Sequence, residues 1–90
     1  GDFFPIFPCE KIVFGTSSQA SNILFDDPKI SRQHCMVEYI PEHKMYYITD
    51  CSTNGTFLND GRRIPFNTPF ACAPRTRFYF GTDRQMFELV

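Results

Sequence analysis

The chain has 90 residues, of which 42% are hydrophobic and 17% aromatic, and its 9 basic and 10 acidic side chains leave a formal net charge of −1. This apolar content excludes a disordered chain, and the balanced charge argues against a nucleic-acid binder. No apolar run is long enough to span a membrane, so no membrane partner is expected. The length suits a single domain over residues 1–90. Because the chain starts with Gly1 rather than Met, we expect this domain to be part of a longer protein.

Short runs of β-branched and aromatic residues, separated by turn residues, follow one another along the chain. No segment has the spacing of apolar residues that is typical of an amphipathic helix. A series of short strands of this kind predicts an all-β sandwich or barrel. The expected strands, in chain order, are residues 3–7, 11–14, 23–25, 35–40, 45–49, 56–58, 62–64, 68–72, 77–80 and 85–90.

Two local signals support these strands. Residues 41–44 join two of them at hairpin length, and residues 59–61 carry the Asn, Asp and Gly that are typical of a tight turn. Near the end of the chain, Phe78 and Phe80 alternate with other side chains. An alternation with a period of two predicts one buried face and one partly exposed face.

The four cysteines are at positions 9, 35, 51 and 72, with no Cys-x-x-Cys pair and no cluster with histidine. These spacings predict no metal site and no cofactor. The even number would permit two disulfides, but cysteines in apolar segments are typical of buried free thiols. We therefore expect an intracellular protein in a reducing compartment, either the nucleus or the cytoplasm.

Three expected loops are rich in hydrogen-bonding groups, namely residues 15–18, 29–34 and 50–56. They offer hydroxyl and amide groups, an Arg and a Lys, with glycines that allow backbone N–H groups to converge. Loops at one end of a sandwich often carry function because a rigid scaffold holds them. Donors and cations without a general base are suited to an oxyanion ligand.

These loops contain a Gly at position 15, the run Ser-Arg-Gln-His at residues 31–34, and Ser-Thr-Asn-Gly-Thr-Phe-Leu-Asn at residues 52–59. The order resembles the forkhead-associated (FHA) domain family, whose pattern is Gly-Arg, then Ser-x-x-His, then Ser-Thr-Asn-Gly-Thr. The resemblance extends over nearly the whole chain. It implies a β-sandwich of about eleven short strands. It also implies a non-catalytic signalling module that binds phosphothreonine peptides through loops at one end.

The resemblance implies a role for each matching ligand residue. Ser31 would bond the phosphate through its hydroxyl, and Arg32 would add charge or a backbone N–H to the same group. Thr53 would also reach the phosphate, and Asn54 would hold the peptide main chain. Lys29 matches a position that helps to select a peptide side chain further along. The partner would be a phosphorylated protein, or another domain of the same chain.

Further positions would support the loops, and one departs from the family pattern. Gly15, His34 and Gly55 match residues that shape the loops, with His34 tying them together. The family's glycine is usually followed by an Arg that contacts phosphate, whereas here Thr16 follows it at the rim of the site. A neutral hydroxyl forms a weaker bond to phosphate than a guanidinium does. Either Arg32, Arg62 or Arg63 compensates, or the domain makes phosphate-independent contacts with its partner.

Other interpretations of single residues remain open at this point. Ser31 taken alone could cap a turn, and residues 62–63 could be a solvated face. His34 and Cys35 are adjacent on an expected strand and point to opposite faces, so no thiol–base pair and no enzymatic activity are expected. Residues 25–28 and 80–84 resemble one FHA subgroup, the nuclear inhibitors of protein phosphatase one and splicing-associated proteins. That subgroup would imply a nuclear protein.

Overall fold

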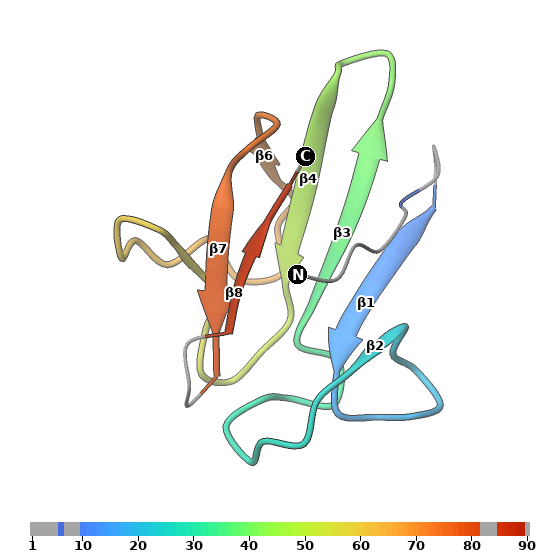
Figure 1. The fold of residues 1–90 in the computed structure, drawn as a ribbon, viewed down its shortest axis with the longest axis vertical. Coiled ribbons are helices and arrows are strands. Elements are labelled where there is room, and N and C mark those ends of the chain that lie inside the picture. The colour runs from blue at the N-terminus through green and yellow to red at the C-terminus, as the bar shows by residue number, and fades with distance from the viewer. Residues whose placement is uncertain (1–5, 7–9, 82–84, 90) are drawn as a thin grey trace.

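The structure, a computed structural model, describes residues 6, 10–81 and 85–89. The described residues form two β-sheets and no helix. One layer is a five-stranded sheet and the other a three-stranded sheet, packed face to face (Figure 1). The eight strands are β1 (Lys11–Gly15), β2 (Ile23–Leu24), β3 (Cys35–Ile40), β4 (Met45–Asp50), β5 (Phe57–Leu58), β6 (Phe70–Cys72), β7 (Arg77–Phe80) and β8 (Gln85–Glu88).

The five-stranded sheet has the order β2-β1-β3-β4-β6, and the three-stranded sheet has the order β5-β7-β8. All neighbouring strands pair antiparallel except β1 and β2, which run parallel. The long β3–β4 hairpin projects away from the other strands (Figure 1). Its turn uses the left-handed backbone of Lys44, at φ 53°, as a tight hairpin connection requires.

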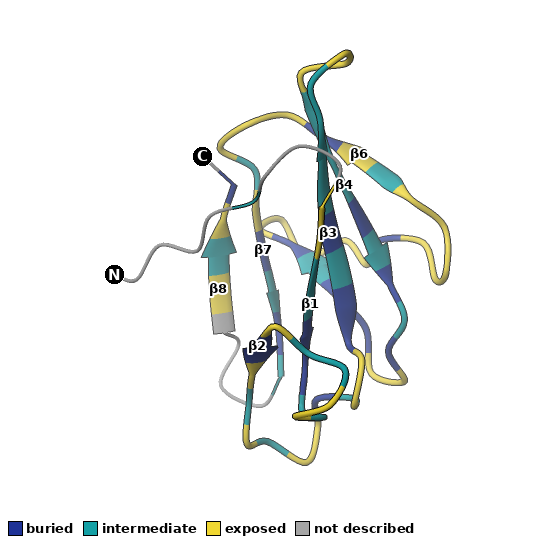
Figure 2. Ribbon diagram, turned by 90° about the vertical axis from the view of Figure 1, so that its right-hand side faces the viewer, coloured by how far each residue is buried: buried dark blue, intermediate teal, exposed yellow. Residues whose placement is uncertain are grey.

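The core lies between the two sheets and is largely aromatic. Phe78 and Phe80 are 0% and 1% exposed, so the predicted alternation along β7 is confirmed. The ring of Phe14 from the larger sheet meets Phe78, Phe80 and Phe87 edge-on, with ring centroids 5.8, 6.0 and 5.0 Å apart. Buried residues are concentrated in the strands, and exposed residues in the connecting loops (Figure 2).

Several predicted strands differ from the structure by one or two residues at an end, and one is replaced by an isolated bridge. Residues 62–64 form only an isolated bridge between Arg63 and Phe57, because Pro65 follows at once and cannot donate to a ladder. The strand predicted over residues 68–72 begins at Phe70, since Pro69 also lacks a backbone N–H. The strand predicted over residues 3–7 lies outside the described residues apart from Ile6, which packs against the core.

The three cysteines that the structure describes are free thiols. Cys35 is fully buried, and the loss of solvation raises the pKa of its thiol far above the ordinary value. Burial also raises the pKa of Cys72 to about 11. A thiol with a raised pKa carries little of the reactive thiolate, so these side chains act as small apolar residues of the core. Cys9 lies outside the described residues.

Candidate functional site

Three loops that are far apart in the sequence meet at one end of the sandwich (Figure 1). The loop after β1 is joined to the loop before β3 by bonds from the N–H of Thr16 to the carbonyl of Ser31 (3.1 Å) and from Ser17 to Arg32 (3.2 Å). The loop after β4 is joined to the same segment by a bond from the N–H of Cys51 to the carbonyl of His34 (2.8 Å). Backbone bonds therefore hold together the three loops that the sequence predicts to be rich in hydrogen-bonding groups.

Gly15 is the point of closest approach between two of these loops. A Cβ atom at this position would lie 2.0 Å from the carbonyl oxygen of Arg32 and 2.8 Å from the Oγ of Ser21. No side chain fits at the first of these distances, since it would overlap a backbone atom that bonds hold in place. The absence of a side chain at Gly15 is therefore what allows the loops to touch.

The predicted ligand residues lie side by side in this cluster. The Oγ of Ser31 accepts a bond from the N–H of Thr53 (3.1 Å), and the side-chain amide of Asn54 donates to the carbonyl of Lys29 (2.8 Å). Thr53, Asn54 and Lys29 are exposed. The hydroxyl hydrogen of Ser31 and the carbonyl oxygen of the Asn54 amide remain available to a ligand.

His34 connects the loops from the side of the core. Its ring is fully buried and stacks on Phe80 with the centroids 4.3 Å apart. Its Nδ1 accepts a bond from the N–H of Ser31 (3.1 Å), and its Nε2 faces the carbonyl of Gly55 at 2.9 Å. These partners select the neutral ring with the hydrogen on Nε2. Burial lowers the pKa of His34, which keeps the ring neutral at physiological pH.

We expect the stability of the domain to fall as the pH drops below the ordinary His pKa of 6.5. Below that pH the unfolded chain takes up a proton on this histidine, while the folded protein with its lowered pKa does not. The unfolding free energy then falls by up to about 1.4 kcal/mol per pH unit until the pH reaches the pKa of His34 in the folded state. Above the ordinary value the contribution is fully present. Urea unfolding from about pH 7.5 to about pH 5.5, followed by circular dichroism, measures this dependence.

The matched control for this prediction is His43→Gln. His43 is exposed in the β3–β4 hairpin, where its ring bonds to the hydroxyl of Tyr47 (2.7 Å). The variant should keep the pH dependence of the wild type, because His34 is unchanged. A wild-type stability that does not vary over this range, or a slope that disappears in His43→Gln, would contradict the role assigned to the buried ring.

A buried carboxylate organises the loop between β4 and β5. Asp50 is 0% exposed, and its Oδ1 accepts bonds from the N–H of Ser52 (3.1 Å), the hydroxyl of Ser52 (2.6 Å) and the hydroxyl of Thr56 (3.0 Å). The other oxygen, Oδ2, faces Arg63 at 3.3 Å. The Oγ of Ser52 in turn accepts a bond from the N–H of Gly55 (2.7 Å). This network shapes the turn that presents Thr53 and Asn54.

Asp50, Ser52 and Thr56 have no role predicted from the sequence, although they form this network. An Asp in a loop often accepts a bond from the backbone N–H two residues further on, as Asp50 does from Ser52. This tendency is the local signal that indicates a turn at Asp50. That signal does not distinguish a buried carboxylate from a solvated one.

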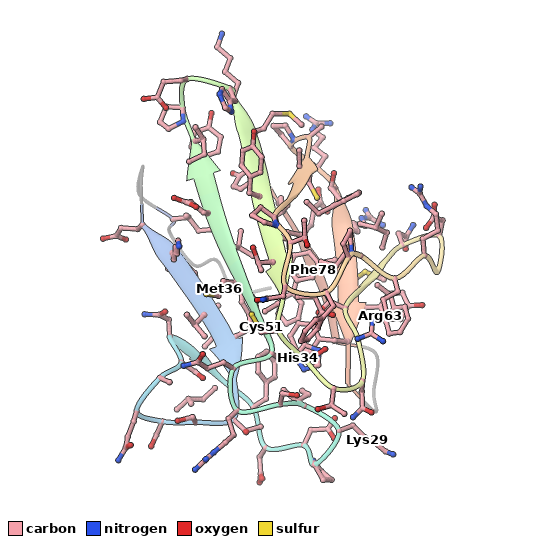
Figure 3. All side chains as sticks on the ribbon, turned by 180° about the vertical axis from the view of Figure 1, so that it is seen from behind. Lys29, His34, Met36, Cys51, Arg63 and Phe78 are labelled. Atoms are coloured by element: carbon pink, nitrogen blue, oxygen red, sulfur yellow. The ribbon has the colours of Figure 1, made fainter. Side chains whose placement is uncertain are left out.

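The basic side chains at the loop end differ in how they are paired. Arg63 is paired with Asp50, and Arg62 lies 2.8 Å from Asp60. Lys29 and Arg32 are exposed and form no ion pair within the described part of the chain. Figure 3 shows Lys29 at the outer tip of the loop end, with His34 and Arg63 further inside. Among the residues that the structure describes at the loop end, the cations left available to an anion are therefore Lys29 and Arg32.

This arrangement of loops agrees with the comparisons to known proteins. A sequence profile of the FHA domain matches residues 12–81, which is most of the chain. The chain belongs to the FHA domain family. The fold agrees, since the MEK1 FHA domain in complex with a HOP1 phosphothreonine peptide superposes with a TM-score of 0.82 at 21% identity, covering 96% of this chain and 85% of that one.

Two more FHA structures have the same fold. The FHA domain of CT664 from Chlamydia trachomatis is 26% identical with a TM-score of 0.74, covering 88% of this chain and 75% of that one. The N-terminal FHA domain of Rad53p from S. cerevisiae, in complex with a phosphothreonine peptide, is 20% identical with a TM-score of 0.70, covering 88% and 68%. An uncharacterized protein of Schizosaccharomyces pombe, C3H7.13, is 40% identical over 57 residues, which are 62% of this chain but 19% of that protein.

The described part of this FHA domain contains no group of His, Cys, Asp or Glu side chains that could hold a metal ion. Nor does any helix in that part have the length and apolar character needed to cross a membrane.

Proposed function

We propose that this FHA domain is a non-catalytic interaction module that binds phosphothreonine segments of partner proteins at the loop end of its sandwich. The observation that carries the proposal is the cluster of Ser31, Thr53 and Asn54, which bonds between loops hold together. Lys29 and Arg32 flank the cluster and form no ion pair with any residue that the structure describes. A phosphate has oxygens that accept hydrogen bonds and nearly two negative charges, which hydroxyl donors and cations satisfy. The complexes of the MEK1 and Rad53p FHA domains with phosphothreonine peptides support the same ligand here.

Each residue has a specific part in this proposal. The hydroxyls of Ser31 and Thr53 donate to phosphate oxygens, and Arg32 adds a charge-assisted bond. The amide of Asn54 bonds the peptide main chain with its free oxygen, and Lys29 lies at the rim where the peptide leaves the site. Gly15, His34 and Gly55 maintain the loop geometry through close approach and the bonds to the His34 ring.

The cellular setting follows from the same reasoning. We propose that the whole protein acts in intracellular signalling, in the nucleus or the cytoplasm, where kinases mark threonines. The resemblance of residues 25–28 and 80–84 to the nuclear phosphatase-inhibitor and splicing-associated subgroup supports the nucleus.

The experiment that tests the function uses a degenerate peptide library with a central phosphothreonine, and the same library with plain threonine. Calorimetric titration of the protein with each should give an affinity for the phosphorylated library that is about a hundredfold higher or more, since the phosphate supplies two or three charge-assisted bonds. Equal affinities would show that the domain makes phosphate-independent contacts, as the loss of the family's Arg at position 16 would permit.

Thr16→Arg is expected to raise the affinity for phosphothreonine peptides. The N–H of Thr16 bonds to the carbonyl of Ser31, so a longer basic side chain at this position starts beside the phosphate donors. Replacing a neutral bond by a charge-assisted one should tighten binding roughly tenfold, as measured by titration with a phosphothreonine peptide. Thr16→Gln, which adds length without charge, should change the affinity little. Tighter binding of the plain threonine peptide by Thr16→Arg would contradict a site that recognises phosphate.

A further inference from the structure

One side chain from the loop after β5 contacts both ends of the turn that carries Thr53 and Asn54. The guanidinium of Arg63 donates from Nη2 to the carbonyl oxygen of Ser52 at 3.5 Å, where the turn begins. Its Nε lies 3.0 Å from where a Cβ on Gly55 would be, so the guanidinium also lies against the backbone where the turn ends. Figure 3 shows Arg63 beside the bend of this loop. Arg63 therefore spans a turn whose exposed tip carries two of the candidate ligand residues.

Backbone pairing determines where the Arg63 side chain starts. Arg63 is opposite Phe57 in the isolated antiparallel bridge, and the N–H of Ile64 bonds to the carbonyl of Thr56 at 3.0 Å. Opposite residues of an antiparallel pair present their side chains to the same face. Both side chains do lie against Gly55, where an added Cβ would be 2.9 Å from the Cζ of Phe57. The bridge at residue 63 thus serves to place a guanidinium over the turn.

The charge of Arg63 is matched inside the protein by Asp50. The Nη2 of Arg63 lies 3.3 Å from the Oδ2 of Asp50, whose side chain is 0% exposed, whereas the Arg63 side chain is 43% exposed. A phosphate that drew the guanidinium away would leave a buried carboxylate without its cation, which is strongly unfavourable. The ion pair therefore holds the guanidinium over the turn and makes it unsuitable as a direct ligand of the phosphate.

The tip of the turn depends on such a support because its own contacts are few. Thr53 and Asn54 are exposed, and each is linked to a neighbouring loop by one exposed hydrogen bond. Water can replace bonds of this kind, so they do not by themselves fix the two residues. Groups that bind a ligand must be held within about 0.5 Å of the productive geometry by contacts behind them. The contacts of Arg63 at both ends of the turn supply that support.

We infer that Arg63 is a positioning residue of the phosphothreonine site, which sets the affinity by fixing Thr53 and Asn54 without contacting the phosphate itself. It acts through the backbone of the turn at Ser52 and Gly55. The inference rests on the proposed function, because the two residues that it positions are the proposed ligand residues. A turn that is already ordered before binding loses less conformational freedom when the peptide arrives, and the affinity is correspondingly higher.

The test is a calorimetric titration of Arg63→Gln with the phosphothreonine library, at a temperature where circular dichroism shows the variant to be folded. Its affinity should be about tenfold lower than that of the wild type, since two side chains must then be ordered on binding. Arg77→Gln is the matched control, because Arg77 also forms an ion pair at 3.3 Å, but with the exposed Glu88 on the three-stranded sheet. It should bind the library as tightly as the wild type.

Two further variants separate positioning from a general effect on stability. Arg63→Lys keeps a charge beside Asp50 but lacks the planar fork that reaches both ends of the turn. It should recover most of the urea midpoint that Arg63→Gln loses, yet bind the library about fivefold more weakly than the wild type. In the Asn54→Ala background, the effect of Arg63→Gln on affinity should fall from about tenfold to about threefold, because Thr53 alone remains to be positioned.

The outcomes distinguish this inference from the proposed function. If the wild type binds the phosphothreonine library and Arg63→Gln binds it equally well, positioning by Arg63 is overturned and the phosphate site stands. A full tenfold loss in the Asn54→Ala background, or full affinity in Arg63→Lys, would overturn it as well. So would a weaker salt dependence of binding in Arg63→Gln, since that would show a direct contact between this cation and the phosphate. If the wild type does not bind the phosphothreonine library, the proposed function fails and the inference fails with it.

Discussion

Asp50→Ala is expected to lower the unfolding free energy by about 3–5 kcal/mol, the largest effect on stability that we predict. The substitution removes a fully buried carboxylate that accepts three bonds from Ser52 and Thr56 and faces Arg63. The donors that remain are buried, because Ser52 is 2% and Thr56 is 0% exposed, and water cannot replace the lost partner. Urea unfolding measures the loss, and circular dichroism follows it because the chain has no Trp for fluorescence.

The matched control is Asp60→Ala, which removes the carboxylate of a second Asp–Arg pair among the described residues. Asp60 and Arg62 are both exposed, and their side chains pair at 2.8 Å. Exposed ion pairs contribute little to stability because water solvates both partners when the pair is broken. Asp60→Ala should therefore unfold close to the wild-type urea concentration. Equal losses of unfolding free energy in the two variants would contradict the prediction that burial is what makes the Asp50 carboxylate important for stability.

Ser31→Ala and Asn54→Ala are each expected to weaken phosphothreonine peptide binding by about tenfold to a hundredfold while leaving stability nearly unchanged. Within the protein each side chain makes one exposed bond, from the Thr53 N–H to Ser31 and from Asn54 to the Lys29 carbonyl. Water can replace these bonds, so the folded state loses little. Calorimetric titration with a phosphothreonine peptide measures the loss of binding, and thermal unfolding measures stability.

Ser18→Ala is the control for this pair of variants, because Ser18 is an exposed serine of the loop after β1 and takes no part in the cluster. It should bind the peptide as tightly as the wild type. A large loss of stability in Ser31→Ala or Asn54→Ala, together with an unchanged affinity, would show that the side chain supports the loop and does not contact the ligand.

Patterns within single strands are the part of the fold that the sequence predicts well. The alternation around Phe78 and Phe80 reflects a local period of two, which a sheet with one buried face imposes. The division into two sheets and the parallel pairing of β1 with β2 depend on contacts between distant segments, so no local pattern predicts them. The strand predicted at residues 62–64 is wrong because a short run between two turns does not show whether a ladder partner is in reach.

The candidate site is also predictable only in part, because it too depends on contacts between distant segments of the chain. The runs at residues 31–34 and 52–59 identify the loops, because they match the FHA pattern of Ser-x-x-His followed by Ser-Thr-Asn-Gly-Thr. The bond from Thr53 to Ser31 joins residues that are 22 positions apart and appears only in the folded structure. The cross-strand alignment of Phe57, Tyr79 and Met86 is also not predictable from the sequence, since these residues belong to three separate strands. Their position on one face of the sheet is a property of the register.

The most direct test of phosphate recognition by these loops is a heteronuclear NMR titration with paired phosphothreonine and threonine peptides of the same sequence. The phosphorylated peptide should shift the backbone amide signals of Ser31, Arg32, Thr53 and Asn54, which belong to two of the three loops of the site. The amides of the β3–β4 hairpin at the other end of the sandwich should stay in place, and the plain threonine peptide should leave all these signals unchanged. Equal shifts with both peptides, or shifts from the phosphorylated peptide that avoid Ser31 and Asn54, would contradict a phosphothreonine site at the loop end.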